Sequence, residues 1–113
     1  YSEPALLDHF PHVVETKCPN THNRMDLCCK TAKEFDLFYE IVEYRKEIRW
    51  LCRFDDDQYL NEKNLLDYLA TFNASEPLYI GRTSITNRLK LEKSNRTFTF
   101  ATYGAGVCFS RAL

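Results

Sequence analysis

The chain has 113 residues, which suits one small domain with a single core. Its 15 basic and 16 acidic residues leave a formal charge of -1 and form no basic patch, which argues against a protein held to nucleic acid by charge. No apolar run is long enough to span a bilayer and no leader-like segment stands out, so we expect any membrane anchor to lie outside the chain. The chain lacks an initial methionine and stops where a helix is expected to begin, which predicts one partial domain over residues 1–113, truncated at both ends.

The first residues predict a short helix followed by a loop, because Pro4 and Pro11 enclose an apolar turn at residues 5–10. Val13 and Val14 then predict a strand. The three histidines are scattered along the chain, and we expect them at the surface or at helix caps rather than as metal ligands: His9, His12 and His22.

A long amphipathic helix is predicted from Asn23, a suitable N-cap, to about Tyr44. Its apolar side chains recur at helical spacing: Leu27, Cys28, Ala32, Phe35, Phe38 and Val42. Adjacent helix positions differ by about 100°, so Cys28 joins this apolar face and is expected to be a buried thiol. Cys29 turns away from the face and is free to reach Cys18.

An alternating strand that runs into three carboxylates is the most informative stretch. Four side chains share one strand face at period two: Ile48, Trp50, Cys52 and Phe54. Asp55, Asp56 and Asp57 follow, at a strand end that in open α/β sheets faces a ligand crevice. Adjacent carboxylates repel one another, and a divalent cation with a preference for oxygen relieves that repulsion. We therefore predict a Mn²⁺ or Mg²⁺ site that is completed by the phosphates of a nucleotide-diphosphate donor.

Other interpretations of the acidic triplet stay open. A solvated acidic turn that caps the following helix has the same composition. An EF-hand does not fit, because glycine is missing at the sixth loop position and glutamate at the twelfth. A phosphatase-like Asp-x-Asp fits the spacing, but such folds usually place that pair on their first strand.

The middle of the chain predicts a second helix and two further strands. The helix is capped by Asn61, ends at Asn73 and has a buried face made of Leu65, Leu66, Leu69 and Phe72. Strands are predicted at residues 78–80 and 97–100, with an exposed loop over residues 82–96 between them. The alternation of helix and strand predicts an α/β architecture, in which a mostly parallel sheet is flanked by helices.

A glycine-containing turn follows the last of these strands: Tyr103, Gly104, Ala105 and Gly106. Its two glycines allow a tight turn at which the backbone approaches a ligand closely, and an ordinary turn is the alternative. A dinucleotide-binding fingerprint is excluded because the third glycine is missing.

Five cysteines and two glycosylation sequons favour the secretory pathway over the cytosol. The sequons begin at Asn73 and Asn95, which are the candidate glycosylation sites. The cysteines form no Cys-x-x-Cys zinc pattern.

Three motifs keep a specific order and spacing over residues 13–113. The first contains Cys18, His22, Arg24, Leu27, Cys29 and Lys30, followed by Ala32, Glu34 and Asp36. The second contains Trp50, Cys52, Phe54, Asp55, Asp56, Asp57 and Tyr59. The third contains Phe100, Ala101, Thr102, Gly104, Ala105, Gly106, Cys108, Ser110 and Arg111. Together they resemble the Fringe glycosyltransferases, which belong with other β-1,3-transferases of GT-A fold.

The resemblance implies part of a GT-A-type nucleotide-sugar-binding domain. It implies an inverting enzyme that transfers GlcNAc from UDP-GlcNAc in β-1,3 linkage to O-linked fucose on the EGF-like repeats of a Notch-type receptor. It also implies a Golgi membrane protein with a lumenal catalytic domain, single-pass type II in the full-length form. Nucleic acid is not an expected partner.

The resemblance also assigns roles to residues. Asp57 would bind Mn²⁺ or Mg²⁺, Asp56 would contact the donor, and Asp55 is a weaker candidate there. The turn at residues 103–106 would line the donor or acceptor. The implied disulfides join Cys18 to Cys29 and Cys52 to Cys108, which leaves Cys28 as a thiol. The catalytic base is expected downstream of Leu113, so residues 1–113 alone are expected to be inactive.

Three positions depart from the family pattern. Gln58 stands where the family usually has Asn, Thr99 where it has Trp, and Tyr103 where it has Gly. These departures affect the predicted sugar specificity more than the predicted fold. A β-1,3-galactosyltransferase or a non-catalytic glycan-binding relative therefore stays open.

Overall fold

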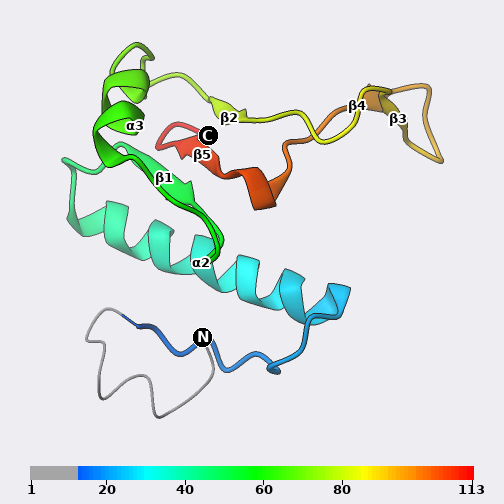
Figure 1. The fold of residues 1–113 in the computed structure, drawn as a ribbon, viewed down its shortest axis with the longest axis horizontal. Helices are drawn as coiled ribbons and strands as arrows, with labels where there is room; N and C mark the ends of the chain where they lie inside the picture. Colours follow the sequence, from blue (N-terminus) through cyan, green and yellow to red (C-terminus); the bar gives the residue numbers. More distant parts are fainter. Residues whose placement is uncertain (1–12) are drawn as a thin grey trace. The chain divides into compact units, whose positions relative to one another are not determined.

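The computed structural model describes residues 13–113, which fall into two compact units (Figure 1). The first ends at Arg45 and the second comprises Lys46–Leu113. The predicted helix at residues 5–10 and the positions of His9 and His12 lie outside the described residues. Across residues 13–113, no helix combines the length and the hydropathy needed to cross a membrane.

The first unit is built on helix α2, Arg24–Tyr44, as the sequence predicts. Asn23 is the N-cap, and its side-chain oxygen accepts a hydrogen bond from the backbone N–H of Asp26 at 2.9 Å. The Asn23 amide in turn donates to the Asp26 carboxylate at 2.6 Å. Because helix N-termini leave backbone donors unsatisfied and favour negative charge, this local pair is sufficient to define where the helix begins.

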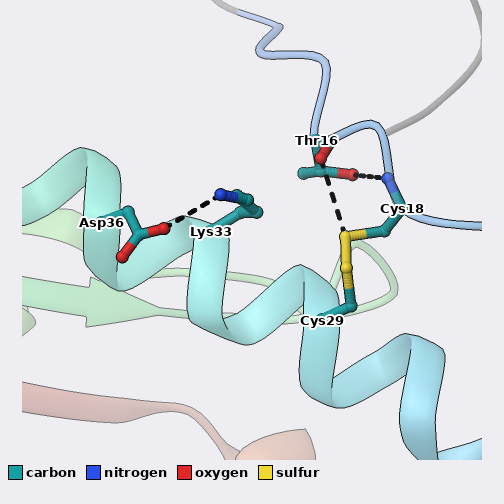
Figure 2. Close-up of polar contacts among 5 residues, drawn as sticks. All are labelled: Thr16, Cys18, Cys29, Lys33 and Asp36. Atoms are coloured by element: carbon teal, nitrogen blue, oxygen red, sulfur yellow. Dashed lines mark hydrogen bonds and ion pairs between the residues drawn. A yellow bond between two sulfur atoms is a disulfide. The ribbon is translucent and has the colours of Figure 1, made fainter.

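The segment before α2 is tied to it by a disulfide between Cys18 and Cys29, with Cα atoms 6.0 Å apart (Figure 2). This confirms the first predicted pairing. The backbone N–H of Cys18 also donates to Thr16 Oγ1 at 3.4 Å. The strand predicted at Val13 and Val14 is wrong, since residues 13–19 form no helix or strand. Lys17 has φ of +56°, which turns the chain out of an extended path just after these residues.

The apolar face predicted for α2 is only partly covered. Val42 is buried, but Leu27 and Phe35 keep 42% and 37% of their surface exposed. The prediction that Cys28 is a buried thiol is wrong, because its side chain is exposed. Helical spacing determines which residues share a face. It does not determine whether another element packs against that face.

The second unit contains a sheet of three strands in the order β1-β5-β2. The strands are β1, Trp50–Arg53; β2, Tyr79–Gly81; and β5, Val107–Ser110. The central strand β5 is antiparallel to both neighbours, so the predicted mostly parallel sheet is wrong. Since β1 and β2 both oppose β5, they run parallel to each other, as the helix between them implies. The chain then returns through residues 82–106 and inserts β5 between them.

Helix α3, Glu62–Leu69, connects β1 to β2. The predicted cap is confirmed, because the side-chain oxygen of Asn61 accepts from the backbone N–H of Asn64 at 3.0 Å. Leu69 is buried, whereas Leu66 is 65% exposed. The predicted burial of Leu66 is therefore wrong, and Phe72 lies beyond the helix with 36% of its surface exposed. The helix ends at Leu69 rather than at Asn73, so Phe72 is not part of the helix and does not share a helical face with the leucines.

The core of this unit is centred on β5. All four residues of the strand are buried, because it has a neighbour on each side. Val107 and Phe109 pack with Ala101, and Leu51 and Tyr103 pack against this cluster. Ser110 is a buried polar residue at the end of β5, and its hydroxyl group has hydrogen-bond partners. The hydroxyl donates to the carbonyl of Glu76 at 2.6 Å and accepts from the N–H of Leu78 at 2.9 Å.

Residues 82–100 form an antiparallel hairpin rather than only a loop (Figure 1). Its strands are β3, Leu89–Lys90, and β4, Thr97–Phe98, so the strand predicted at residues 97–100 is shorter than expected. The prediction of an exposed loop missed β3, but the segment is almost entirely exposed. The polar composition of this segment correctly predicted its exposure to solvent but gave no indication that β3 and β4 pair.

Candidate functional site

The acidic triplet follows directly after β1, which is cross-linked to the core strand. Cys52 on β1 lies opposite Cys108 on β5, and the two form a disulfide that confirms the second predicted pairing. Because β5 lies between β1 and β2, the disulfide ties the end of β1 that carries the acids to a fully buried strand.

The acids lie on a tight turn. The backbone N–H of Gln58 donates to the carbonyl of Asp55 at 3.3 Å and closes the four-residue turn. Asp56 and Asp57 occupy its two central positions and are exposed. Their position at the corner of the turn leaves both side chains accessible from solvent, whereas Asp55 is half-buried.

Asp55 pairs with a cation two residues before it in the chain. Arg53 Nη1 lies 2.8 Å from Asp55 Oδ1, with 25% of the Arg53 side chain and 38% of the Asp55 side chain exposed. The Arg53 guanidinium also lies over the ring of Tyr103, 5.2 Å from its centroid. One of the three carboxylates is therefore compensated internally.

Gln58 connects the acidic turn to the glycine-containing turn. Its side-chain oxygen accepts from the backbone N–H of Asp55 at 3.3 Å, and its side-chain nitrogen donates to the carbonyl of Gly104. A single side chain thus holds both turns, and we call it the Gln58 bridge. Gly104 lies close enough that an added Cβ would be 3.5 Å from Asp55 Oδ2.

The glycine-containing turn is a 3-10 helix, Tyr103–Ala105, that ends at Gly106. Gly106 has φ of +82°, and an added Cβ would lie 2.5 Å from the ring of Phe54. Both backbone conformation and packing therefore require glycine there. Packing explains Gly106 without a ligand, so the predicted role of this turn in donor or acceptor binding rests on its place beside the acids.

A divalent cation would find few protein ligands here. Within residues 13–113 no group of three potential histidine, cysteine or carboxylate ligands converges. Asp56 and Asp57 nevertheless offer exposed carboxylate oxygens on one turn. This donor set fits an ion that takes one or two carboxylates from the protein and its remaining ligands from water and substrate phosphate. It does not fit a cation enclosed entirely by protein.

An open cleft of about 480 Å³ lies beside Tyr103. It is lined by Tyr79, Ser84, Phe100, Ala101, Thr102 and Tyr103. The Tyr79 hydroxyl accepts a hydrogen bond from the backbone N–H of Ala101 at 3.1 Å and thus fixes the cleft wall. No charged side chain lines the cleft, so it suits a neutral group with an apolar face.

Sequence reasoning did not predict the contacts made by two residues at this site. Arg53 was missed, although strand alternation places residues i and i+2 on one side and thus indicated a pair with Asp55. Gln58 was noted only as a departure from a pattern. Its bond to Gly104 joins residues 46 positions apart, which no local pattern reveals.

The two candidate glycosylation sites lie away from this site in the fold, on separate exposed turns. Asn73 follows α3, and its side-chain oxygen accepts from the N–H of Ser75 at 3.0 Å. Asn95 lies between β3 and β4. Both residues are exposed, as attachment of a glycan requires.

Comparison with known proteins gives a consistent result. The family model described as Fringe-like matches residues 3–113. Radical fringe of Xenopus laevis, a beta-1,3-N-acetylglucosaminyltransferase by name, is 44% identical over 108 residues, which are 89% of this chain and 30% of the relative. The Fringe glycosyltransferase of Drosophila melanogaster is 39% identical over 90% of this chain and 26% of its own length.

Radical fringe of Gallus gallus is 37% identical over 110 residues, which are 90% of this chain and 28% of the relative. The chain therefore spans less than a third of the length of these three relatives.

Proposed function

The chain belongs to the Fringe-like family, and on that premise we propose that it is part of a transferase that moves GlcNAc from UDP-GlcNAc to O-linked fucose. The product linkage is β-1,3, and the acceptor fucose is carried by EGF-like repeats of a Notch-type receptor. The observation that carries the proposal is the exposed acidic turn, held beside the glycine-containing turn by the Gln58 bridge. The names of the relatives support the sugar that is transferred.

Each acid has a separate role in this proposal. Asp57 binds Mn²⁺ or Mg²⁺, and Asp56 contacts the donor. Asp55 is a positioning residue, because its carboxylate is engaged by Arg53 at 2.8 Å. When bound, the metal neutralises charge on the diphosphate leaving group. The protein holds the two exposed carboxylates in place before the donor arrives, so little ordering is needed on binding.

The base that deprotonates the acceptor hydroxyl lies outside this chain in our proposal. An inverting transferase needs a base on the face opposite the departing diphosphate. Asp56 and Asp57 are assigned to metal and donor on the leaving-group side. Arg53 occupies the third carboxylate. The acidic turn therefore has no carboxylate left for that second task.

We further propose that the protein works in the Golgi lumen, attached by a membrane anchor outside these residues. Two disulfides and two exposed sequons support an oxidising, glycosylating compartment. The GT-A fold is likewise a proposal. It rests on the family and on the β1-α3-β2 crossover of parallel strands.

The test is transfer by the full-length protein from UDP-GlcNAc to an O-fucosylated EGF-like repeat in the presence of Mn²⁺. Asp57→Ala is expected to abolish transfer. It should leave the melting temperature of the metal-free protein unchanged or slightly raised, because one of two repelling charges is removed. Asp67→Ala is the matched control, since Asp67 is an exposed acid on α3 that pairs with Lys63 at 2.8 Å.

Full transfer by the Asp57→Ala variant would remove the metal hypothesis. A large loss of metal-free stability would instead support a purely structural acidic turn. Tyr103 lies against Arg53 and stands where the family usually has glycine. Because this departure lies beside the acidic turn, a second donor sugar is also tested. Transfer from UDP-galactose in place of UDP-GlcNAc would identify the β-1,3-galactosyltransferase alternative.

A further inference from the structure

The hairpin arm, as we name residues 82–100, carries an apolar face that is open to solvent. Leu89 and Phe98 lie opposite each other in register and so share a face. Phe100 continues that face by alternation, with its ring centroid 6.3 Å from that of Phe98. Leu91, whose N–H donates to the carbonyl of Arg96 at 3.1 Å, extends it toward the tip. Each of the four apolar side chains keeps 39 to 45% of its surface exposed.

The same arm is basic, so the expectation from the sequence that the chain has no basic patch is wrong for this segment. It contains a single acid, Glu92, and five basic residues: Arg82, Arg88, Lys90, Lys93 and Arg96. All six are exposed, and none of the basic side chains forms an ion pair with a carboxylate in the part of the chain that the structure describes. The whole chain has 15 basic and 16 acidic residues, so the residues outside the arm have a net negative charge and the arm has a net positive charge. A partner that complements it is acidic.

The base of the arm is joined to the candidate site. The N–H of Ser84 donates to the carbonyl of Phe100 at 2.9 Å, and the N–H of Thr102 donates to the carbonyl of Arg82 at 2.8 Å. Thr102 and Phe100 also line the cleft beside Tyr103, whose ring contacts Arg53. The paired strands β3 and β4 lie away from β1 and β5 (Figure 1), so a molecule that reacts at the acidic turn reaches them only if it extends beyond the reacting sugar. A polypeptide acceptor does so.

We propose that the hairpin arm docks the polypeptide of the acceptor, through an acidic surface that presents apolar side chains next to the modified residue. A two-stranded hairpin is marginally stable by itself, so covering its apolar face stabilises both partners. The proposal rests on the proposed function. It adds a specificity surface that is separate from the metal and the donor.

The experiment uses the full-length protein with two acceptors, an O-fucosylated EGF-like repeat and a small aryl α-fucoside. One variant removes the apolar face, Leu89→Ser with Phe98→Ser. Another reverses charge, Lys90→Glu with Lys93→Glu. Both should raise KM for the repeat by about tenfold, the effect of losing one interfacial anchor. The KM values for the fucoside and for UDP-GlcNAc should not change.

Lys63→Glu on α3 is the matched charge control, because Lys63 is exposed and lies outside the arm. It should leave all three KM values unchanged. An unchanged KM for the repeat in both arm variants would overturn the proposal, as would an equal rise for the small fucoside. A fall of about ten degrees in melting temperature would show that the rest of the protein covers the face, which also overturns it.

Two further measurements distinguish the acceptor polypeptide from other partners that could cover the arm. A dimer that becomes a monomer in the Leu89→Ser, Phe98→Ser variant would assign the face to a second copy of the protein. Wild-type binding to phosphatidylserine vesicles that the charge reversal abolishes would assign it to a membrane. Absence of transfer to either acceptor would defeat the proposed function alone. Direct binding of the repeat to wild type and arm variants would then still decide whether the arm docks it.

Discussion

Gln58 shows how much of the site depends on one side chain. Its amide group accepts from Asp55 and donates to Gly104, so it holds the acidic turn against the glycine-containing turn. Arg53 acts from the other side by pairing with the Asp55 carboxylate. Asp56 and Asp57 are exposed and lie on the turn that these contacts hold. We therefore assign Gln58 a positioning role in metal binding rather than direct contact with substrate.

Gln58→Glu is expected to weaken metal binding, because the new carboxylate cannot donate to the Gly104 carbonyl. The Mn²⁺ concentration for half-maximal transfer should rise about tenfold, the lower end for residues that orient a metal ligand. Stability should fall by only about 1 kcal/mol, as for one hydrogen bond. Activity titrated with Mn²⁺, alongside thermal melting, measures both effects.

Lys63→Gln, on the exposed face of α3, is the control for a change at the surface. If Gln58→Glu lowered stability strongly and left the Mn²⁺ requirement unchanged, Gln58 would be structural and not a positioning residue.

At the scale of elements, β5 organises the second unit. It lies between β1 and β2, supplies the buried core residues and carries the cysteine that is bonded to β1. The disulfide joins residues 56 positions apart, whereas Cys18 and Cys29 are 11 apart. In the chain-entropy model, closing the longer loop removes more freedom from the unfolded chain.

Removing the Cys52–Cys108 bond is expected to cost more stability than removing the Cys18–Cys29 bond. The model gives about 4 kcal/mol for the first and about 3 kcal/mol for the second. Double alanine variants of each pair, compared by urea unfolding, test the order. Cys28→Ala, which removes an exposed thiol, should change stability by no more than about 0.5 kcal/mol. Equal losses for the two pairs, or a larger loss for Cys18 and Cys29, would contradict the loop-length argument.

At the scale of the whole molecule, the chain spans 26–30% of the three relatives compared above. The acidic turn lies within it, but the turn alone does not provide a complete inverting site. In our proposal the base and the remaining donor contacts come from sequence outside residues 1–113. On that proposal, transfer requires the full-length protein.

Residues 1–113 expressed alone are expected to transfer no sugar at a measurable rate, whereas the full-length protein does. The reason is that Asp56 and Asp57 are committed to metal and donor, so no carboxylate of the acidic turn is left to act as a base. Both proteins should be incubated with UDP-GlcNAc, Mn²⁺ and an O-fucosylated repeat. The full-length Asp57→Ala variant serves as the inactive reference. Robust turnover by residues 1–113 would show that the base has been misplaced.

Features that depend on neighbours a few positions away could be predicted from the order of the residues. The start of α2 follows from Asn23 and Asp26, and the start of α3 from Asn61 and Asn64, because each cap is closed within one turn of helix. The strand before the acids follows from alternation. Three motifs in the chain indicated the family, and the resemblance to that family implied both disulfides.

Features that depend on contacts between residues far apart in the chain could not be predicted in this way. The direction of β5 depends on the path of residues 82–106, so the alternation of helix and strand predicted the wrong sheet. The exposure of Cys28 depends on what covers α2, which helical spacing does not determine. The bond from Gln58 to Gly104 spans 46 positions and forms only when β5 places the second turn beside the first. The local sequence pattern specifies which side chains share a face of a helix or strand. The path of the chain between distant elements specifies which element packs against that face.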